Sequence, residues 1–208
     1  EPGAGSDLSR VRCRASADGD GWHITGEKIF ISGGDQDMSD KVLHLVLART
    51  SDNGIKGLSL FLCPCTRADG SRNAVTVTRI EEKMGLHASP TCQLAFDGAV
   101  AELVGREGEG LKAMFIMMNA ARLGVGLQGL AQGEIAYQNA VIYAGDRRQG
   151  RALTGAQDPQ EKADTLFVHP DVRRMLMDGK AFTESMRSLV LWGALQVDLA
   201  DKAETEEE

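Results

Sequence analysis

The sequence has 208 residues, enough for one or two domains, and its 42% hydrophobic and 25% charged residues are ordinary for a globular protein. The 23 Lys and Arg against 30 Asp and Glu give a net charge of -7, which argues against nonspecific nucleic-acid binding and against a polybasic membrane-binding surface. No apolar run approaches the ~20 residues needed to span a bilayer, and no basic-then-apolar leader is visible. We therefore predict a cytoplasmic protein with no nucleic-acid or membrane partner.

The two ends of the chain predict a piece of a longer polypeptide. Glu1–Asp7 has no initiator Met and reads as a loop that begins in mid-motif, and Glu204–Glu208 is an acidic run with no structural stop.

Residues 1–108 have the pattern of an antiparallel β domain. An alternating run over residues 11–17 leads through the turn Asp18–Gly21 into a second run over residues 22–32, which predicts a hairpin. Four further strands are expected at Lys41–Arg49, Gly57–Cys63, Ala74–Ile80 and Thr91–Phe96. About six short strands with tight connections favour a small barrel or two packed sheets.

Residues 109–208 change to a helical period. Leu111, Met114, Phe115 and Met118 share helical spacing, and the pattern runs to about Gln149. Three glycines recur on one face of this stretch, namely Gly126, Gly129 and Gly133. Because glycine inside a helix costs ~1 kcal/mol, they predict close packing against another backbone, with a broken helix as the alternative.

A second helix is predicted after a loop over residues 150–167. His169-Pro170 opens it, with Pro at a position favoured in the first turn. Two long helices alone make a poor core, so we expect an incomplete up-and-down helical bundle. The predicted fold class is α+β: a β domain over residues 1–108, followed by the first part of a helical domain over residues 109–208.

The four cysteines, Cys13, Cys63, Cys65 and Cys92, contain no CxxC pair, which predicts free, buried thiols and a reducing compartment. Cys63-Pro64-Cys65 would need two more ligands to hold zinc, so no metal site is predicted. None of the four histidines has a nucleophile and an acid arranged around it, and no pair of carboxylates stands out as an acid/base couple.

Residue chemistry alone marks a few candidate binding residues. The glycine-rich loop Glu1–Asp7 offers backbone N–H groups and the Ser6 hydroxyl to phosphate or carbonyl oxygens, with a plain turn as the alternative. Lys28–Gly34 reads as a strand that ends in an aromatic ring and a hydroxyl, which suits a flat ligand or is simply a strand end.

Arg122 lies in an apolar helical stretch, so it needs an acidic partner or an anionic ligand. Arg147 would lie ~37 Å away on the same continuous helix. The two arginines therefore cannot both serve one small site in one subunit.

Four segments in order resemble motifs of the acyl-CoA dehydrogenase family of flavoproteins. They are EPGAGSD at Glu1–Asp7, GEKIFISG at Gly26–Gly33, KMGLHASPTCQLAF at Lys83–Phe96, and the run from Gly108-Glu109-Gly110-Leu111 through Arg122 to Arg147. The sequences RRQGRAL at Arg147–Leu153 and HPDVRRML at His169–Leu176 are similar to the longer bacterial branch that includes 3-methylmercaptopropionyl-CoA dehydrogenase.

The resemblance implies an FAD-dependent oxidoreductase of fatty-acid metabolism that dehydrogenates an acyl-CoA thioester between its α and β carbons, with 3-methylthiopropionyl-CoA as a candidate substrate. A glutamate would remove the α-proton, the β-hydride would pass to the flavin, and an electron-transfer flavoprotein would accept the electrons. The implied flavin-binding residues are Glu1, Pro2, Gly3, Ala4, Gly5, Ser6, Phe30, Ile31, Ser32, Arg147 and Gln149. The implied acyl-CoA-binding residues are Ser6, Asn119 and Arg122.

In family terms, Arg147 and Gln149 would reach the FAD diphosphate of a neighbouring subunit, which implies a homodimer or tetramer. No catalytic base is expected within these 208 residues, because Ala121 occupies the position before Arg122 where some branches carry the glutamate. The isolated segment is therefore expected to be inactive. Two alternatives remain at this point: a noncatalytic flavin- or CoA-binding or assembly module of the same fold, and a relative of the acyl-CoA oxidase type.

Overall fold

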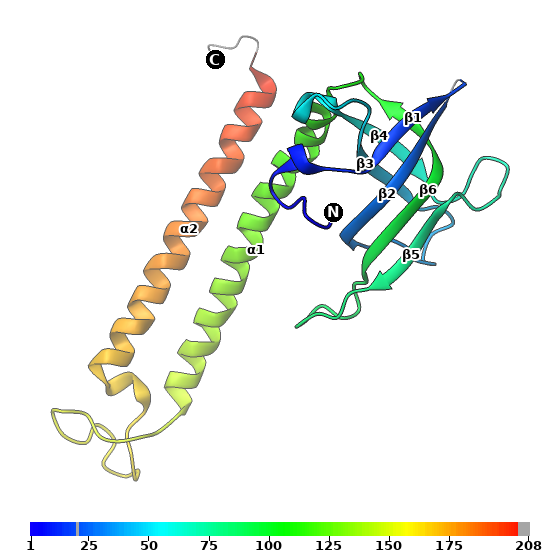
Figure 1. Ribbon diagram of the computed structural model, residues 1–208. Coiled ribbons are helices and arrows are strands. Elements are labelled where there is room, and N and C mark those ends of the chain that lie inside the picture. The colour runs from blue at the N-terminus through cyan, green and yellow to red at the C-terminus, as the bar shows by residue number, and fades with distance from the viewer. Residues whose placement is uncertain (20, 204–208) are drawn as a thin grey trace. The chain divides into compact units, whose positions relative to one another are not determined.

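The computed structural model describes residues 1–19 and 21–203 (Figure 1). Asp20 of the predicted turn and the acidic run Glu204–Glu208 lie outside the described residues. The chain divides into two compact units, Glu1–Met117 and Met118–Glu208. The division into domains at residue 108 stays a prediction.

The first unit holds one six-stranded sheet in the order β2-β1-β3-β4-β6-β5. Its strands are β1 (Arg14–Asp18), β2 (Gly21–Ser32), β3 (Leu43–Arg49), β4 (Leu58–Pro64), β5 (Val75–Ile80) and β6 (Thr91–Val104). Each run expected to be extended overlaps one of these strands. The 3-10 turns Leu8–Arg10 and Gly54–Gly57 precede β1 and β4.

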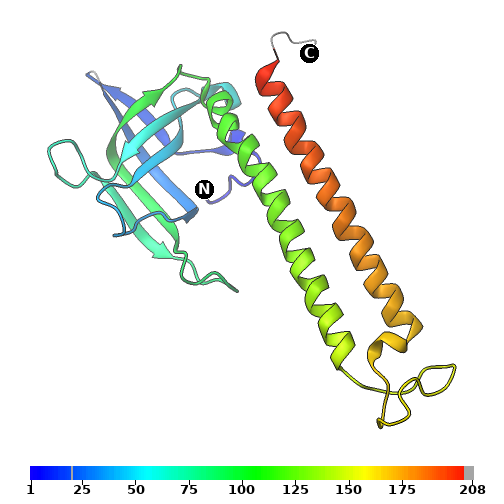
Figure 2. The ribbon, with the colours of Figure 1, turned by 180° about the vertical axis from the view of Figure 1, so that it is seen from behind.

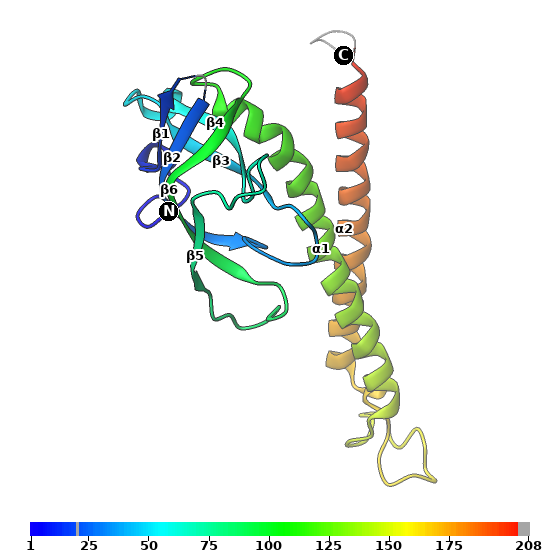
Figure 3. The same cartoon turned by 90° about the vertical axis from the view of Figure 1, so that its right-hand side faces the viewer.

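The sheet is mixed and open, which corrects the expectation of an antiparallel barrel or two packed sheets. β1 and β3 run parallel and share the single registered pair Arg14↔Arg49, whereas the other strand pairs are antiparallel. An additional pairing of β2 with β6 bends the sheet back on itself, as the side view in Figure 3 shows. Because one residue pair is all that joins β1 to β3, the ladder does not close into a barrel.

β6 continues beyond the end predicted at Phe96, because Asp97-Gly98 is a bulge and not a turn. Ile24 pairs with Ala99 and Thr25 pairs with Asp97, so Gly98 is the extra residue in β6. Its φ of 68° lies in the left-handed region that glycine adopts without strain.

The core of the first unit is the face of the curved sheet on which alternate strand residues converge. Its fully buried hydrophobic members include Ile24, Ala48, Leu58, Phe61, Cys63 and Ala99. All four cysteines are free and buried, as predicted. Burial raises the pKa of Cys13 to about 11 and that of Cys63 to about 12, so both thiols stay protonated at neutral pH.

The second unit is built on an antiparallel helical hairpin, shown from behind in Figure 2. The helices are α1 (Gly110–Asp146), whose first turns belong to the first unit, and α2 (Pro170–Lys202). A 3-10 turn, Leu166–Val168, precedes α2. The α1 helix is continuous, so the alternative of a broken helix is wrong. An ion pair between Glu134 and Arg187, with oxygen and nitrogen 2.8 Å apart, joins the helices.

The predicted glycine face of α1 meets α2 at one of its three positions. A Cβ atom added to Gly133 would lie 3.6 Å from the Thr183 methyl group, whereas Cβ atoms at Gly126 and Gly129 would meet nothing within 4 Å. Among the described residues, only Gly133 of the three meets α2 in this way, and the expectation of close packing at Gly126 and Gly129 stays a prediction. Gly126 and Gly129 instead line an apolar groove of about 380 Å³ between the helices.

In the part of the chain that the structure describes, no helix is both long and apolar enough to cross a membrane.

Candidate functional site

The end of β2 carries an exposed aromatic residue with a strained backbone. Lys28 pairs with Leu94 and Ile31 pairs with Cys92, so β2 takes three steps where β6 takes two. Within this bulge Phe30 has a φ of 60°, and 66% of its surface is exposed. Left-handed backbone at a bulky residue costs ~1–3 kcal/mol and clusters at functional sites. Because the ring makes few packing contacts with the rest of the protein, the bulge leaves it accessible to a ligand.

A hydroxyl group stands two residues beyond the ring on the same strand. Ile31 packs against the core, whereas Ser32 is exposed, as the period of two in a strand requires. The Gly33 N–H donates to the Pro90 carbonyl at 2.8 Å and fixes the strand end. The structure therefore brings Phe30 and Ser32 together at one end of β2.

The opening loop is divided between anchors and exposed groups. The Glu1 carboxylate pairs with the Lys28 ammonium at 2.6 Å and accepts hydrogen bonds from the Arg12 and Cys13 amides at 2.6 and 3.3 Å. Ala4 is buried in the core cluster. The four other predicted loop residues, Pro2, Gly3, Gly5 and Ser6, are exposed. Glu1 and Ala4 therefore hold the loop to the sheet while the residues between and after them remain open to a ligand.

The Glu1 carboxylate is held in its ionised form. Burial raises the pKa of the group, but the Lys28 hydrogen bond, the Arg12 amide, the Lys28 charge and the Cys13 amide together outweigh it. The pKa consequently lies below its ordinary value. Lys28 also donates to the Leu47 carbonyl at 2.6 Å, so the ion pair links the loop, β2 and β3.

A second strained segment at the same end of the sheet escaped the sequence reasoning as a site. Leu86 lies between β5 and β6 with a φ of 53° and is 78% exposed. The Lys83 ammonium holds this loop by donating to the carbonyls of Leu86 and Ser89 at 2.9 and 2.6 Å. The loop leads into Thr91, which pairs with Ser32, so it lies beside the end of β2. A Lys followed three residues later by an exposed Leu gives no sequence signal for this conformation.

Asn119 and Arg122 form a pair on α1. The Arg122 guanidinium donates to the Asn119 side-chain oxygen at 3.0 Å, and both residues are exposed. Neutral Asn119 leaves the cationic charge of Arg122 in place, which keeps the pair suited to an anionic or carbonyl-rich ligand.

The arginines that follow α1 have different roles. The guanidinium of Arg148 pairs with Asp158 at 2.8 Å, and that of Arg151 pairs with Asp164 at 3.2 Å, so both stabilise the loop itself. Arg147 is exposed, and its side chain has no hydrogen-bond or ion-pair partner among residues 1–19 and 21–203. The Gln149 side-chain amide is likewise exposed. Both side chains are therefore accessible at the start of the loop.

The structure keeps Arg122 and Arg147 apart within the second unit. Arg122 and Asp146 lie on the same unbroken helix, and 24 residues at a rise of ~1.5 Å separate them by ~36 Å. The predicted separation of these two arginines along one continuous helix is therefore confirmed.

Comparison with known proteins finds a matching family and similar relatives. Residues 1–99 match the family model "Acyl-CoA dehydrogenase, middle domain". The chain is 48% identical over 210 residues to 3-methylmercaptopropionyl-CoA dehydrogenase of Ruegeria pomeroyi, an alignment that covers 97% of this chain and 35% of that protein. It is 44% identical over 214 residues to the broad-specificity linear acyl-CoA dehydrogenase FadE5 of Mycobacterium tuberculosis, covering 96% of this chain and 35% of that protein.

Solved structures agree. The crystal structure of a probable acyl-CoA dehydrogenase from Mycobacterium abscessus is similar with a TM-score of 0.77 at 27% identity, covering 98% of this chain and 49% of that one. The chain thus spans about a third of the length of the two curated relatives named above. The open β sheet followed by two long helices corresponds to the middle domain and the start of the C-terminal domain. The chain therefore belongs to the acyl-CoA dehydrogenase family.

Proposed function

We propose that this chain provides flavin-facing and acyl-CoA-facing residues of an FAD-dependent acyl-CoA dehydrogenase. The observation that carries the proposal is the exposed Phe30 ring, held at a left-handed φ by the β2 bulge and followed by the Ser32 hydroxyl. A flat aromatic face beside a hydrogen-bond donor is the arrangement that a planar heteroaromatic cofactor requires. When bound, FAD supplies the hydride-accepting chemistry of the reaction.

The residues present fit that cofactor in two chemically distinct parts. Phe30 and Ser32 offer a stacking face and a hydroxyl to the ring system, with the backbone of Ile31 between them. The exposed Gly3, Gly5 and Ser6 add unhindered N–H groups and a second hydroxyl. A Cβ atom on either glycine would meet nothing within 4 Å among the described residues. The cation of Arg147 and the amide of Gln149 suit a diphosphate, and we propose that they serve a neighbouring subunit of a homo-oligomer.

The acyl-CoA substrate is proposed to meet Ser6, Asn119 and Arg122. The Arg122 charge orients polar groups of the thioester ligand, and its hydrogen bond to Asn119 restricts the rotamers of both side chains. The relative from Ruegeria pomeroyi is named for 3-methylmercaptopropionyl-CoA and the one from Mycobacterium tuberculosis for linear acyl-CoAs. We therefore propose a short, unbranched acyl group, with 3-methylthiopropionyl-CoA as the first candidate.

The carboxylate that removes the α-proton is proposed to lie outside these 208 residues, as the Ala121 position predicts. An electron-transfer flavoprotein is the proposed electron acceptor. In this scheme the residues of this chain bind and orient the cofactor and the thioester, and none of them transfers the α-proton.

The proposal is tested by flavin binding to matched variants of the flavoprotein that contains this chain. Phe30→Ala removes the proposed stacking face, and we expect the FAD dissociation constant to rise about tenfold, since a buried aromatic pair contributes ~0.5–1.5 kcal/mol beyond area burial. Ile55→Ala is the control, because Ile55 is 51% exposed in the 3-10 turn Gly54–Gly57, which precedes β4 and lies outside β2 and its bulge. Equal FAD affinity of the two variants would contradict the proposed site.

A further inference from the structure

The loop between α1 and α2 is built around one buried carboxylate. Asp164 is 1% exposed although it lies in an irregular segment. Its two oxygens accept the amide of Ala152 at 3.0 Å, the amide of Gln157 at 3.1 and 3.2 Å, and the amide of Asp158 at 2.9 Å. The Arg151 guanidinium donates to the same carboxylate at 3.2 Å.

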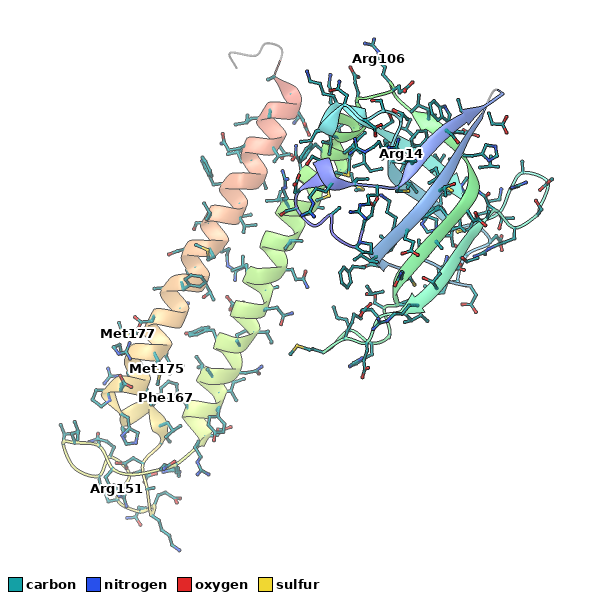
Figure 4. The ribbon with its side chains drawn as sticks, in the orientation of Figure 1. Arg14, Arg106, Arg151, Phe167, Met175 and Met177 are labelled. Atoms are coloured by element: carbon teal, nitrogen blue, oxygen red, sulfur yellow. The ribbon has the colours of Figure 1, made fainter. Side chains whose placement is uncertain are left out.

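These hydrogen bonds keep the carboxylate ionised. The amides of Ala152, Asp158 and Gln157, with the Arg151 guanidinium, outweigh desolvation and hold the pKa of Asp164 far below its ordinary range. One side chain therefore organises residues 151–158 at any pH near neutrality. Figure 4 shows Arg151 in this loop, beyond the end of the helical hairpin.

The backbone of Asp164 holds the segment that carries the proposed diphosphate contacts. The Gln149 N–H donates to the Asp164 carbonyl at 2.9 Å, and the Asp164 N–H donates to the Gly150 carbonyl at 3.0 Å. The Leu166 N–H donates to the Arg147 carbonyl at 2.9 Å. Residues 147–150 are thus paired antiparallel with residues 164–166, as the bridge between Arg148 and Thr165 also records.

A side-chain contact from His169, the residue before α2, also fixes this segment. The His169 Nε2 lies 2.7 Å from the Gln149 carbonyl oxygen. Gly150 has a φ of 72°, and a Cβ atom there would lie 3.3 Å from the His169 ring. Both backbone groups of Gln149 are therefore satisfied inside the loop, while its side chain and that of Arg147 remain exposed.

We propose that Asp164 is a positioning residue for cofactor binding: it sets the backbone of residues 147–150 so that Arg147 and Gln149 face the FAD diphosphate. The inference rests on the proposed function. Its physical basis is preorganisation, because a segment fixed before binding loses less conformational entropy when the ligand arrives. Asp164 itself, being buried, does not touch the cofactor.

The test measures FAD affinity and tryptic cleavage in the flavoprotein that contains this chain. The variants are Arg147→Ala, Asp164→Ala and their combination, with Asp69→Ala as the control. Asp69 similarly caps a surface turn, accepting the Ser71 amide and hydroxyl at 2.9 and 2.6 Å, but belongs to the first unit. Asp164→Asn is the milder variant, since it keeps the size of the side chain and one acceptor oxygen.

We expect Arg147→Ala to weaken FAD binding about 10–100-fold, as for the loss of a charge-assisted hydrogen bond, and Asp164→Ala to weaken it by a similar factor. The combined loss should fall short of the product of the two single losses, because both act through one contact. Asp164→Asn should lie between Asp164→Ala and the unchanged protein, and Asp69→Ala should change the affinity less than about twofold. In the apoprotein, Asp164→Ala should speed cleavage after Arg151 or Lys162.

The outcomes separate the inference from the proposed function. If Arg147→Ala leaves FAD affinity unchanged, the assigned role of Arg147 in cofactor binding fails, even where loop cleavage rises in Asp164→Ala. If Arg147→Ala weakens binding but Asp164→Ala and Asp164→Asn do not, the positioning role is overturned. Fully multiplicative losses would overturn it as well, because Asp164 would then act independently of Arg147.

Discussion

Breaking the ion pair between Glu1 and Lys28 should destabilise the β unit far more than breaking an exposed pair of the same length. In Lys28→Met the Glu1 carboxylate keeps its two backbone amide donors but loses its cation, and the Leu47 carbonyl loses a donor. The side chains of Lys28 and Glu1 are only 14% and 5% exposed. Removing one partner of a buried pair costs ~3–5 kcal/mol, because the other charge stays buried without compensation.

The matched control is Arg14→Met. Arg14 and Asp52 lie 2.5 Å apart, but their side chains are 58% and 78% exposed, so the loss should be below ~1 kcal/mol. Urea unfolding followed by Trp22 fluorescence suits the comparison, because Trp22 packs on Phe61 within the same unit, and Trp192 of α2 can be replaced by Phe in every variant. If Lys28→Met costs no more than Arg14→Met, the role assigned to the buried pair is wrong.

The same pair predicts a pH dependence with a defined sign. The folded pKa of Glu1 lies below its ordinary value of 4.5, so the carboxylate contributes stability that is present above that pH. This contribution is lost as the pH falls through the lower folded pKa. The difference in unfolding free energy between the unchanged chain and Lys28→Met should therefore shrink on acidification below about pH 4.5. Between about pH 6 and 8 the difference should stay constant. A difference that grows on acidification would contradict the assignment.

Three further changes test other parts of the structure. Phe30→Gly should leave the unfolding free energy unchanged or raise it by up to ~1 kcal/mol, because glycine relieves the left-handed φ. It should weaken FAD binding as Phe30→Ala does. A clear loss of stability in denaturant unfolding would refute the strain argument. Gly57→Ala should cost ~1–3 kcal/mol or more, since its Cβ atom would lie 2.1 Å from the Ser51 carbonyl oxygen, whereas Gly85→Ala, with nothing within 4 Å, serves as the neutral control in the same measurement. The four buried thiols should resist a disulfide reagent at about pH 8 and react only after unfolding in urea. Burial keeps the reagent out, and it also raises the pKa of Cys63 to about 12 and that of Cys13 to about 11. Rapid reaction in the native chain would place a thiol at the surface.

The sequence predicts the elements well because their signals are local. Period-two alternation marks the strands, and the helical spacing of apolar residues marks α1 and α2, since each pattern reports which face meets the core. The long continuous α1 was foreseeable from the absence of proline between Pro90 and Pro159. The separation of Arg122 from Arg147 followed from helix geometry alone.

The features that shape the candidate site depend on distant partners, so they escape local patterns. The Phe30 bulge exists because β6 takes two steps where β2 takes three, and the Gly98 bulge arises in the same way. Glu1 is buried because Lys28, 27 residues later, supplies the opposite charge. Asp164 follows Ala152 by 12 residues, and nothing in its neighbours shows that three amides and a guanidinium will converge on it.

The sheet closure was mispredicted for a similar reason. Six short strands are compatible with a barrel, with two sheets and with one bent sheet, and the choice depends on how many residues join β1 to β3. One registered pair, Arg14↔Arg49, is too few to continue the ladder. The number of strands alone does not tell how many residue pairs join β1 to β3.

The central claim is tested most directly by an anaerobic titration of the flavoprotein that contains this chain with acyl-CoA thioesters, among them 3-methylthiopropionyl-CoA. The oxidised flavin absorption band is followed at each addition. We predict that a short unbranched thioester bleaches the band, which would demonstrate the dehydrogenase half-reaction. Bound flavin that no thioester bleaches would contradict the proposed reaction, and a protein that binds no flavin would contradict the proposed cofactor site at Phe30 and Ser32.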